Sequence, residues 1–181
     1  TGVSPVQVDG HSPLPITLDV DEPLTVGADR IVNTLAAARL FERDTIVVDF
    51  GTATTFDCIT ADGRFIGGVI MPGVRTAADE LVRRTAKLPA TELTAPDHVI
   101  GRRTEDCIRA GVLWGAADAV DGLIRRIRDE WPTRSQDRPL VVATGGLATL
   151  VAPLTREIES VQPDLTLLGL RLAAEALGLG W

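Results

Sequence analysis

The sequence predicts an α/β domain, and three observations support this prediction. Short apolar runs of strand length alternate with longer stretches of helical periodicity. Three strands are expected in succession before a helix, after which the order becomes helix, strand, helix. The chain of 181 residues fits one large domain, and its 45% hydrophobic residues are enough to build a core.

The N-terminal half is expected to hold one helix and a three-stranded unit. Residues 1–25 are rich in Pro and turn formers, so they predict at most short extended pieces. Residues 28–42 predict a helix, because Ile31, Leu35 and Ala38 share one face. Strands then follow at about 45–50, 53–60 and 64–70, and the turn signal Ala61-Asp62-Gly63 separates the last two.

The C-terminal half is expected to be mainly helical around one more strand. A helix over about 75–87 ends before Pro89, and a long helix runs from Thr104 to Trp131 with a bend near Gly111, Gly115 or Gly122. Residues 140–143 predict a strand, a helix begins near Leu147, and the last helix covers about 168–177.

Composition limits the partners that this chain is expected to have. The net charge is −7 and the pI is about 4.8, which argues against a nucleic-acid-binding surface. No apolar run approaches the roughly 20 residues that span a bilayer, and no signal peptide is visible. Cys58 and Cys107 form no metal-ligand pattern, so we expect both to be reduced core residues of a cytoplasmic protein.

The most informative stretch is Asp49-Phe50-Gly51-Thr52-Ala53-Thr54-Thr55, which joins two predicted strands. A turn of this kind can bring backbone N–H groups and threonine hydroxyls up to a phosphate, and Gly51 allows close approach because it has no Cβ. The carboxylate of Asp49 would then hold a cation or a water beside the phosphate. The alternative is a plain hairpin with a buried, hydrogen-bonded Asp.

A second cluster, Gly27-Ala28-Asp29-Arg30, opens the first predicted helix. A carboxylate there can cap free N–H groups and suits the helix dipole. The functional interpretation makes Asp29 a general base and Arg30 a clamp for a carboxylate substrate, because a guanidinium offers two parallel donors. Both interpretations remain open from these residues alone.

Two further clusters are less specific. In Gly101-Arg102-Arg103-Thr104, Thr104 can be a helix N-cap or can offer its hydroxyl to a ligand. In Ala143-Thr144-Gly145-Gly146, the glycine pair marks a tight passage from strand to helix and leaves room for a flat ligand such as adenine.

Taken together, these motifs are specific. The order GADR, DFGTATTFD, GGVIMPG, AKLP, GRRT, ATGG and LTLLGL resembles the type III pantothenate kinases, from about Pro5 to the last helix. That family belongs to the actin-like superfamily of acetate and sugar kinases. The resemblance implies a ribonuclease-H-like lobe, in which a three-stranded meander is combined with helices.

The resemblance also implies roles for individual residues. Asp29 would be the general base, and Asp49 would bind a monovalent cation, K⁺ or NH₄⁺. Pantothenate would contact Gly27, Ala28, Asp29, Arg30 and Thr104, and ATP with Mg²⁺ would contact Gly51, Thr52, Gly145 and Gly146. The sequence departs from the family at Arg102-Arg103, where Lys-Asn is usual, which bears on the contact at Thr104.

The family opens with a DxGNT phosphate loop in a first lobe, and this sequence contains no such motif. Residues 1–27 are therefore expected to be the crossing segment from a first lobe, and residues 28–181 the second lobe. Either the chain is a fragment, or another polypeptide supplies the first lobe.

The expected function is ATP-dependent phosphorylation of pantothenate to 4′-phosphopantothenate, the first step of coenzyme A biosynthesis, by a homodimer. The alternative is a non-catalytic regulatory or ligand-binding relative. The missing phosphate loop favours the alternative, and the presence of Asp29, Asp49 and Thr52 argues against it.

Overall fold

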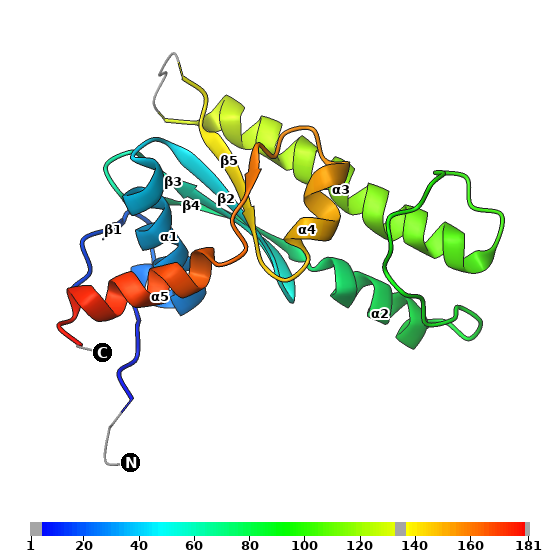
Figure 1. Ribbon diagram of the computed structural model, residues 1–181, viewed down its shortest axis with the longest axis horizontal. Helices are drawn as coiled ribbons and strands as arrows, with labels where there is room; N and C mark the ends of the chain where they lie inside the picture. The colour runs from blue at the N-terminus through cyan, green and yellow to red at the C-terminus, as the bar shows by residue number, and fades with distance from the viewer. Residues whose placement is uncertain (1–4, 133–136, 180–181) are drawn as a thin grey trace.

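The computed structural model describes residues 5–132 and 137–179, and its centre is one mixed sheet with helices on both faces (Figure 1). The strand order is β1-β4-β3-β2-β5-β6. Strands β2, β3 and β4 form an antiparallel meander, and the other three strands pair parallel to their neighbours. The strands are β1 (Thr17–Leu18), β2 (Thr45–Phe50), β3 (Ala53–Ile59), β4 (Arg64–Pro72), β5 (Leu140–Thr144) and β6 (Ser160–Val161).

Two layers of helices cover the sheet. Helices α1 and α5 pack on one face, and α2, α3 and α4 lie on the other (Figure 1). The helices are α1 (Ala28–Phe41), α2 (Val74–Arg84), α3 (Thr104–Glu130), α4 (Ala148–Val151) and α5 (Leu165–Ala176), with 3₁₀ turns at Pro23–Thr25 and Ala152–Leu154. The contact between α1 and α5 is close, since a Cβ at Gly169 would lie 2.1 Å from the backbone oxygen of Val32.

The sheet has a buried core on each face, because successive strand residues point to opposite sides. On the α3 side, Phe50, Phe56, Leu113 and Ile124 are fully buried. On the α1 side, a smaller cluster contains Ala36, Val47, Phe65 and Leu165, and the segment before α1 adds Leu18, Val20 and Val26 to it.

The predicted α/β class and three-stranded meander are confirmed. The meander followed by two parallel strands has the strand order of the ribonuclease-H-like lobe of actin-like proteins. The short edge strand β1 lies within residues 1–25, where at most short extended pieces were expected. The short edge strand β6 was not predicted, because two residues carry no periodicity.

Three predicted helix boundaries differ from the structure. Helix α2 ends at Arg84 rather than at 87, because Thr85 turns extended and its hydroxyl donates to the oxygen of Leu81. The helix expected near Leu147 is one short turn that passes into a 3₁₀ turn containing Pro153, which has no N–H to continue the helix. Helix α5 begins at Leu165, three residues before the predicted start.

Helix α3 is uninterrupted over its 27 residues. Cys58 is buried as expected, but the expectation that Cys107 is a core residue is wrong. Cys107 lies exposed in the first turns of α3, where its thiol donates to the oxygen of Gly101 at 3.4 Å.

Within residues 5–132 and 137–179, no helix has both the length and the apolar character needed to cross a membrane.

Candidate functional site

Two glycine turns lie together at the carboxyl ends of the central strands β2 and β5. Strands β2 and β5 are parallel neighbours, with Asp49 opposite Thr144, so the turns that follow them lie side by side. Gly145 has a φ of +90°, and a Cβ there would lie 2.3 Å from Asp49 Oδ1. Only glycine suits both this conformation and this approach. The structure therefore brings the predicted cation residue Asp49 next to the predicted nucleotide turn at Gly145.

Asp49 is fixed from the helical layer above it. Asn33 Nδ2 of α1 donates to Asp49 Oδ2 at 3.2 Å, and the Thr166 hydroxyl of α5 donates to Asn33 Oδ1 at 2.8 Å. Burial raises the pKa of the Asp49 carboxyl, the bond from Asn33 opposes that rise, and the negative charge of Asp29 adds to it. The two predicted site carboxylates, Asp29 and Asp49, are therefore close enough for the charge of one to affect the pKa of the other.

Two oxygen-bearing side chains lie on paired residues at the ends of β2 and β5, Asp49 and Thr144. Thr144 Oγ1, on the strand residue paired with Asp49, is buried and has no hydrogen-bond partner in the described part of the chain. No group of three or more His, Cys, Asp or Glu side chains among those residues is placed to hold a metal ion. A carboxylate with a hydroxyl oxygen suits a hard cation, rather than a transition metal.

The Gly51–Thr52 turn is tied to the start of α2. The backbone oxygen of Thr52 accepts from Gly73 N at 3.1 Å and from the Thr76 hydroxyl at 2.7 Å. Gly73 permits this, since a Cβ there would lie 2.3 Å from that same oxygen. Thr52 itself is exposed, so its side chain is accessible to a ligand while its backbone is held.

Asp29 lies exposed in the first turn of α1. Its Oδ1 accepts from the backbone N–H of Arg30 at 2.9 Å, so the carboxylate satisfies one of the free donors of this helix end. Gly27 is the N-cap residue, and a Cβ there would lie 2.6 Å from Asp29 Oδ1. The capping interpretation thus has a hydrogen bond in its favour, and the exposure leaves the carboxylate open to a substrate.

Arg30 lies against the sheet rather than in solvent. Its Nε donates to Asp57 Oδ1 at 2.5 Å, its Nη2 donates to the oxygen of Phe56 at 3.0 Å, and its guanidinium lies 4.9 Å from the ring centre of Phe65. Gly68 leaves the room for this, because a Cβ there would lie 2.6 Å from Arg30 Nη2.

Asp57 is the residue that the sequence analysis missed. Its side chain is 0% exposed, and burial raises the pKa of its carboxyl from 3.8 to about 7 against the opposing attraction of Arg30. The charges of Asp49 and Asp29 raise it further. The sequence did contain a signal for it, because Asp57 is a charged residue inside the apolar strand that follows the DFGT motif.

Thr104 is not brought to this site. It begins α3, whose first turns lie beyond α2, far from α1 (Figure 1). The GRRT segment instead borders a separate cavity of about 270 Å³, lined in part by His98, Arg102, Asp106 and Arg109.

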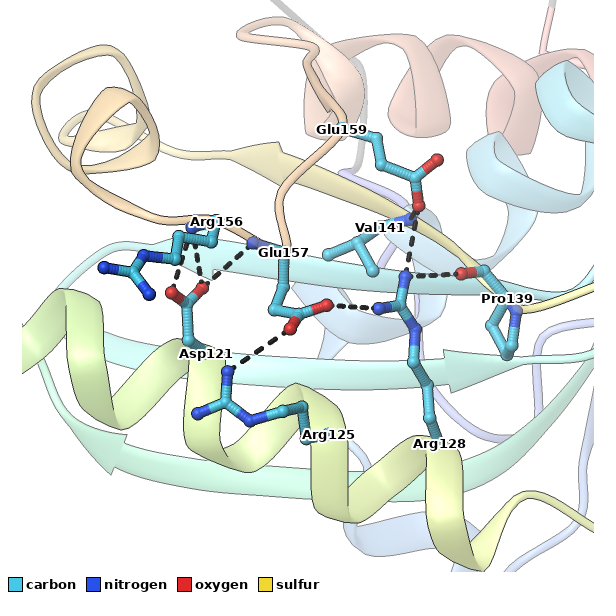
Figure 2. A network of polar contacts seen from close by, with 8 residues as sticks. All are labelled: Asp121, Arg125, Arg128, Pro139, Val141, Arg156, Glu157 and Glu159. Atoms are coloured by element: carbon cyan, nitrogen blue, oxygen red, sulfur yellow. Dashed lines mark hydrogen bonds and ion pairs between the residues drawn. The ribbon is translucent and has the colours of Figure 1, made fainter.

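A polar network fixes the segment between α4 and β6 against α3 (Figure 2). The buried carboxylate of Asp121 accepts from the backbone N–H groups of Arg156 and Glu157 at 2.9–3.0 Å. Glu157 pairs with Arg125 and Arg128, and Arg128 also contacts Glu159. The network restrains the chain that follows the Gly145–Gly146 turn, and so supports the placement of that turn.

The family model and the curated relatives agree on one family. The family model for type III pantothenate kinase matches residues 1–126. The type III pantothenate kinase of Thermomicrobium roseum is 47% identical over 175 residues, which is 97% of this chain and 66% of that protein. The one from Syntrophotalea carbinolica is 50% identical over 152 residues, which is 84% of this chain and 58% of that protein.

The chain thus spans less than two thirds of the length of these relatives. Among solved structures, a Campylobacter jejuni protein described as a conserved Baf family transcriptional activator aligns over 92% of this chain and 71% of its own, with a TM-score of 0.62 and 20% identity. That likeness concerns the fold alone. The family match and the identity of the relatives show that this chain belongs to the type III pantothenate kinase family.

Proposed function

We propose that this chain carries the acceptor and cation sites of an enzyme that phosphorylates pantothenate with ATP. The observation that carries the proposal is that Asp49, Gly51 and Gly145 lie together at the carboxyl ends of β2 and β5. The negative charge of Asp29 also acts on Asp49 there. The product would be 4′-phosphopantothenate, and the step would open coenzyme A biosynthesis. The free thiols of Cys58 and Cys107 fit the reducing cytoplasm in which this would occur.

The acceptor side is assigned to the start of α1. The primary hydroxyl of pantothenate attacks the γ-phosphorus, the bond between that phosphorus and the β-phosphate oxygen breaks, and Asp29 takes the hydroxyl proton. Asp29 suits this role because it is exposed and ionisable at the end of a helix. Arg30, with Gly27 and Ala28, would hold the substrate through its carboxylate.

The nucleotide side is assigned to the two glycine turns. The hydroxyl of Thr52 would contact phosphate, Gly51 would allow the phosphate to approach closely because it has no Cβ, and Gly145 and Gly146 would border the adenosine. Mg²⁺ and a monovalent cation supply charge neutralisation when bound, and phosphoryl transfer depends chiefly on such positioning and electrostatics. Asp49 and the unpartnered hydroxyl of Thr144 would hold the monovalent cation.

A homodimer is part of the proposal. Gly111 and Gly115 lie one turn apart on an exposed side of α3, beside Trp114, and a Cβ at either glycine would meet nothing within 4 Å. Ordinary packing inside the chain therefore does not explain these glycines among the described residues. Thr104 begins the same helix. We also propose that it contacts pantothenate, although within one chain it lies away from Asp29.

The second candidate is a non-catalytic relative that binds ligands. It would bind pantothenate or ATP at the same residues without transferring a phosphoryl group. The exposed Asp29 and Thr52 argue against it, since both side chains are accessible to a ligand and match the residues expected to act in catalysis.

Detection of 4′-phosphopantothenate by ³¹P NMR tests the function. We expect the purified chain, with its mass confirmed, to give no product, and we expect product after addition of a separately made first lobe carrying the DxGNT loop. Turnover by the chain alone would refute the need for that loop. A stable two-chain complex that binds pantothenate without turnover would favour the non-catalytic alternative.

A further inference from the structure

The ion pair of Arg30 and Asp57 is a buried charge pair whose carboxylate has no role in the function proposed above. Asp57 is fully buried on β3, and Asp57 Oδ2 has no hydrogen-bond partner in the described structure. A buried carboxylate is costly unless a cation and hydrogen bonds compensate it. Arg30 is that cation, and only one of the two carboxylate oxygens is used.

The guanidinium of Arg30 is held on one side and free on the other. Nε is bound by Asp57, Nη2 is bound by the oxygen of Phe56, and Phe65 supports the flat face. Nη1 has no partner within the described residues, and it is not among the buried unpartnered atoms. The guanidinium therefore has a fixed orientation, and its Nη1 amino group is left for a ligand.

We propose that Asp57 is a positioning residue, which orients the Arg30 guanidinium so that its free Nη1 amino group can bind the carboxylate of the substrate. This inference rests on the proposed function, because it takes pantothenate as the ligand of Arg30. Arginine side chains lose considerable rotamer freedom when they are ordered. A partner that already holds the side chain removes part of that cost from ligand binding.

The test compares two ligands on two proteins by titration calorimetry. Pantothenate carries the carboxylate, and pantothenyl alcohol carries CH₂OH in its place. We expect Asp57→Asn to weaken pantothenate binding on the order of tenfold, as for loss of a charge-assisted hydrogen bond, and to leave binding of the alcohol unchanged. The matched control is Asp19→Asn, which removes the partner of Arg64 in an exposed pair and should alter neither affinity.

A second measurement tests the positioning directly. In ¹⁵N NMR, the Nε–H signal of Arg30 should exchange slowly with water in the unmodified chain and quickly in Asp57→Asn. If Asp57→Asn does not fold, Arg30→Lys keeps a cation beside Asp57 but lacks the planar fork, and it should show the same selective loss for pantothenate.

The outcomes separate the two claims. Equal losses for both ligands, or a slow Arg30 signal in Asp57→Asn, would overturn the positioning role while leaving the proposed function intact. Failure of the unmodified chain to bind either ligand would contradict the proposed acceptor site, and the positioning role would fall with it.

Discussion

Asn33 on α1 donates from its amide to the carboxylate of Asp49 on β2, across 3.2 Å. The other end of the same amide accepts from Thr166 of α5. A buried side chain from the helical layer therefore sets the direction of the carboxylate at the end of the strand. The second carboxylate oxygen, Asp49 Oδ1, is left facing the Gly145 turn.

This geometry predicts a dependence on monovalent cations in the complete enzyme. Asp49 beside an ATP phosphate would meet strong repulsion, about 4 kcal/mol for unit charges at 4 Å and an effective dielectric of about 20. We expect activity to need K⁺ or NH₄⁺, because Na⁺ is smaller and holds its water more tightly, and we expect Asp49→Ala to remove the dependence with most of the activity. Steady-state rates in each salt, with potassium checked by elemental analysis, provide the measurement.

Asn33→Leu is the matched variant for this prediction. It keeps the side-chain size and Asp49, but it loses the bond that directs the carboxylate, so we expect a higher K⁺ concentration for half activation. Full activity of the unmodified enzyme in sodium-only buffer would show that Asp49 is structural.

The variant Asp29→Asn distinguishes a role of Asp29 as general base from a role as helix cap. Loss of a general base costs on the order of 10²–10⁴-fold in turnover, and we expect this loss in the complete enzyme with little change in ATP affinity. A capping role alone predicts a loss of about 1 kcal/mol in stability with activity kept. Turnover and melting temperature measured on the same variant decide between them, and full activity with a lowered melting temperature would reject the base.

Asp57 predicts a pH dependence of stability. Its pKa rises from 3.8 to about 7 on folding, mainly because of burial. The folded chain therefore holds this proton more tightly, and the stability gained from it at low pH is lost as pH rises through about 7, by up to about 1.4 kcal/mol per pH unit. Urea unfolding between pH 5 and 8 should show the unmodified chain losing stability relative to Asp57→Asn.

The groups that act on Asp57 are Arg30, Asp49 and Asp29, and all three are retained in that variant. Asp19→Asn, at an exposed pair, should keep the pH dependence of the unmodified chain. If the stability of the unmodified chain relative to Asp57→Asn stayed constant or rose with pH, the raised pKa would be contradicted.

The exposed glycines of α3 predict how the chain associates. If a partner helix packs on Gly111 and Gly115, then Gly115→Arg should yield monomers, because the large charged side chain would separate the two backbones. Gly122→Arg is the control on the same helix, since Gly122 also has open space around it. Light scattering at micromolar concentrations measures the mass. A strictly monomeric unmodified chain would exclude a dimer through this face.

The sequence alone determined the elements and the motifs that lie at their ends. Period-two and helical patterns located the meander and α1, because local propensity and alternation are encoded within a few residues. The turn chemistry at Gly51 and at Gly145 was likewise local. Helix ends such as Thr85 were less certain, because a single side-chain bond decided where α2 stopped.

Only the tertiary structure decided which of these motifs meet. The parallel pairing of Asp49 with Thr144 joins segments far apart in the chain, and the bonds from Asn33 to Asp49 and from Arg30 to Asp57 depend on how α1 crosses the sheet. The exposure of Cys107 and the distance of the α3 start from α1 were settled in the same way. Burial and charge coupling are properties of residues brought together by packing, so no local pattern could reveal them.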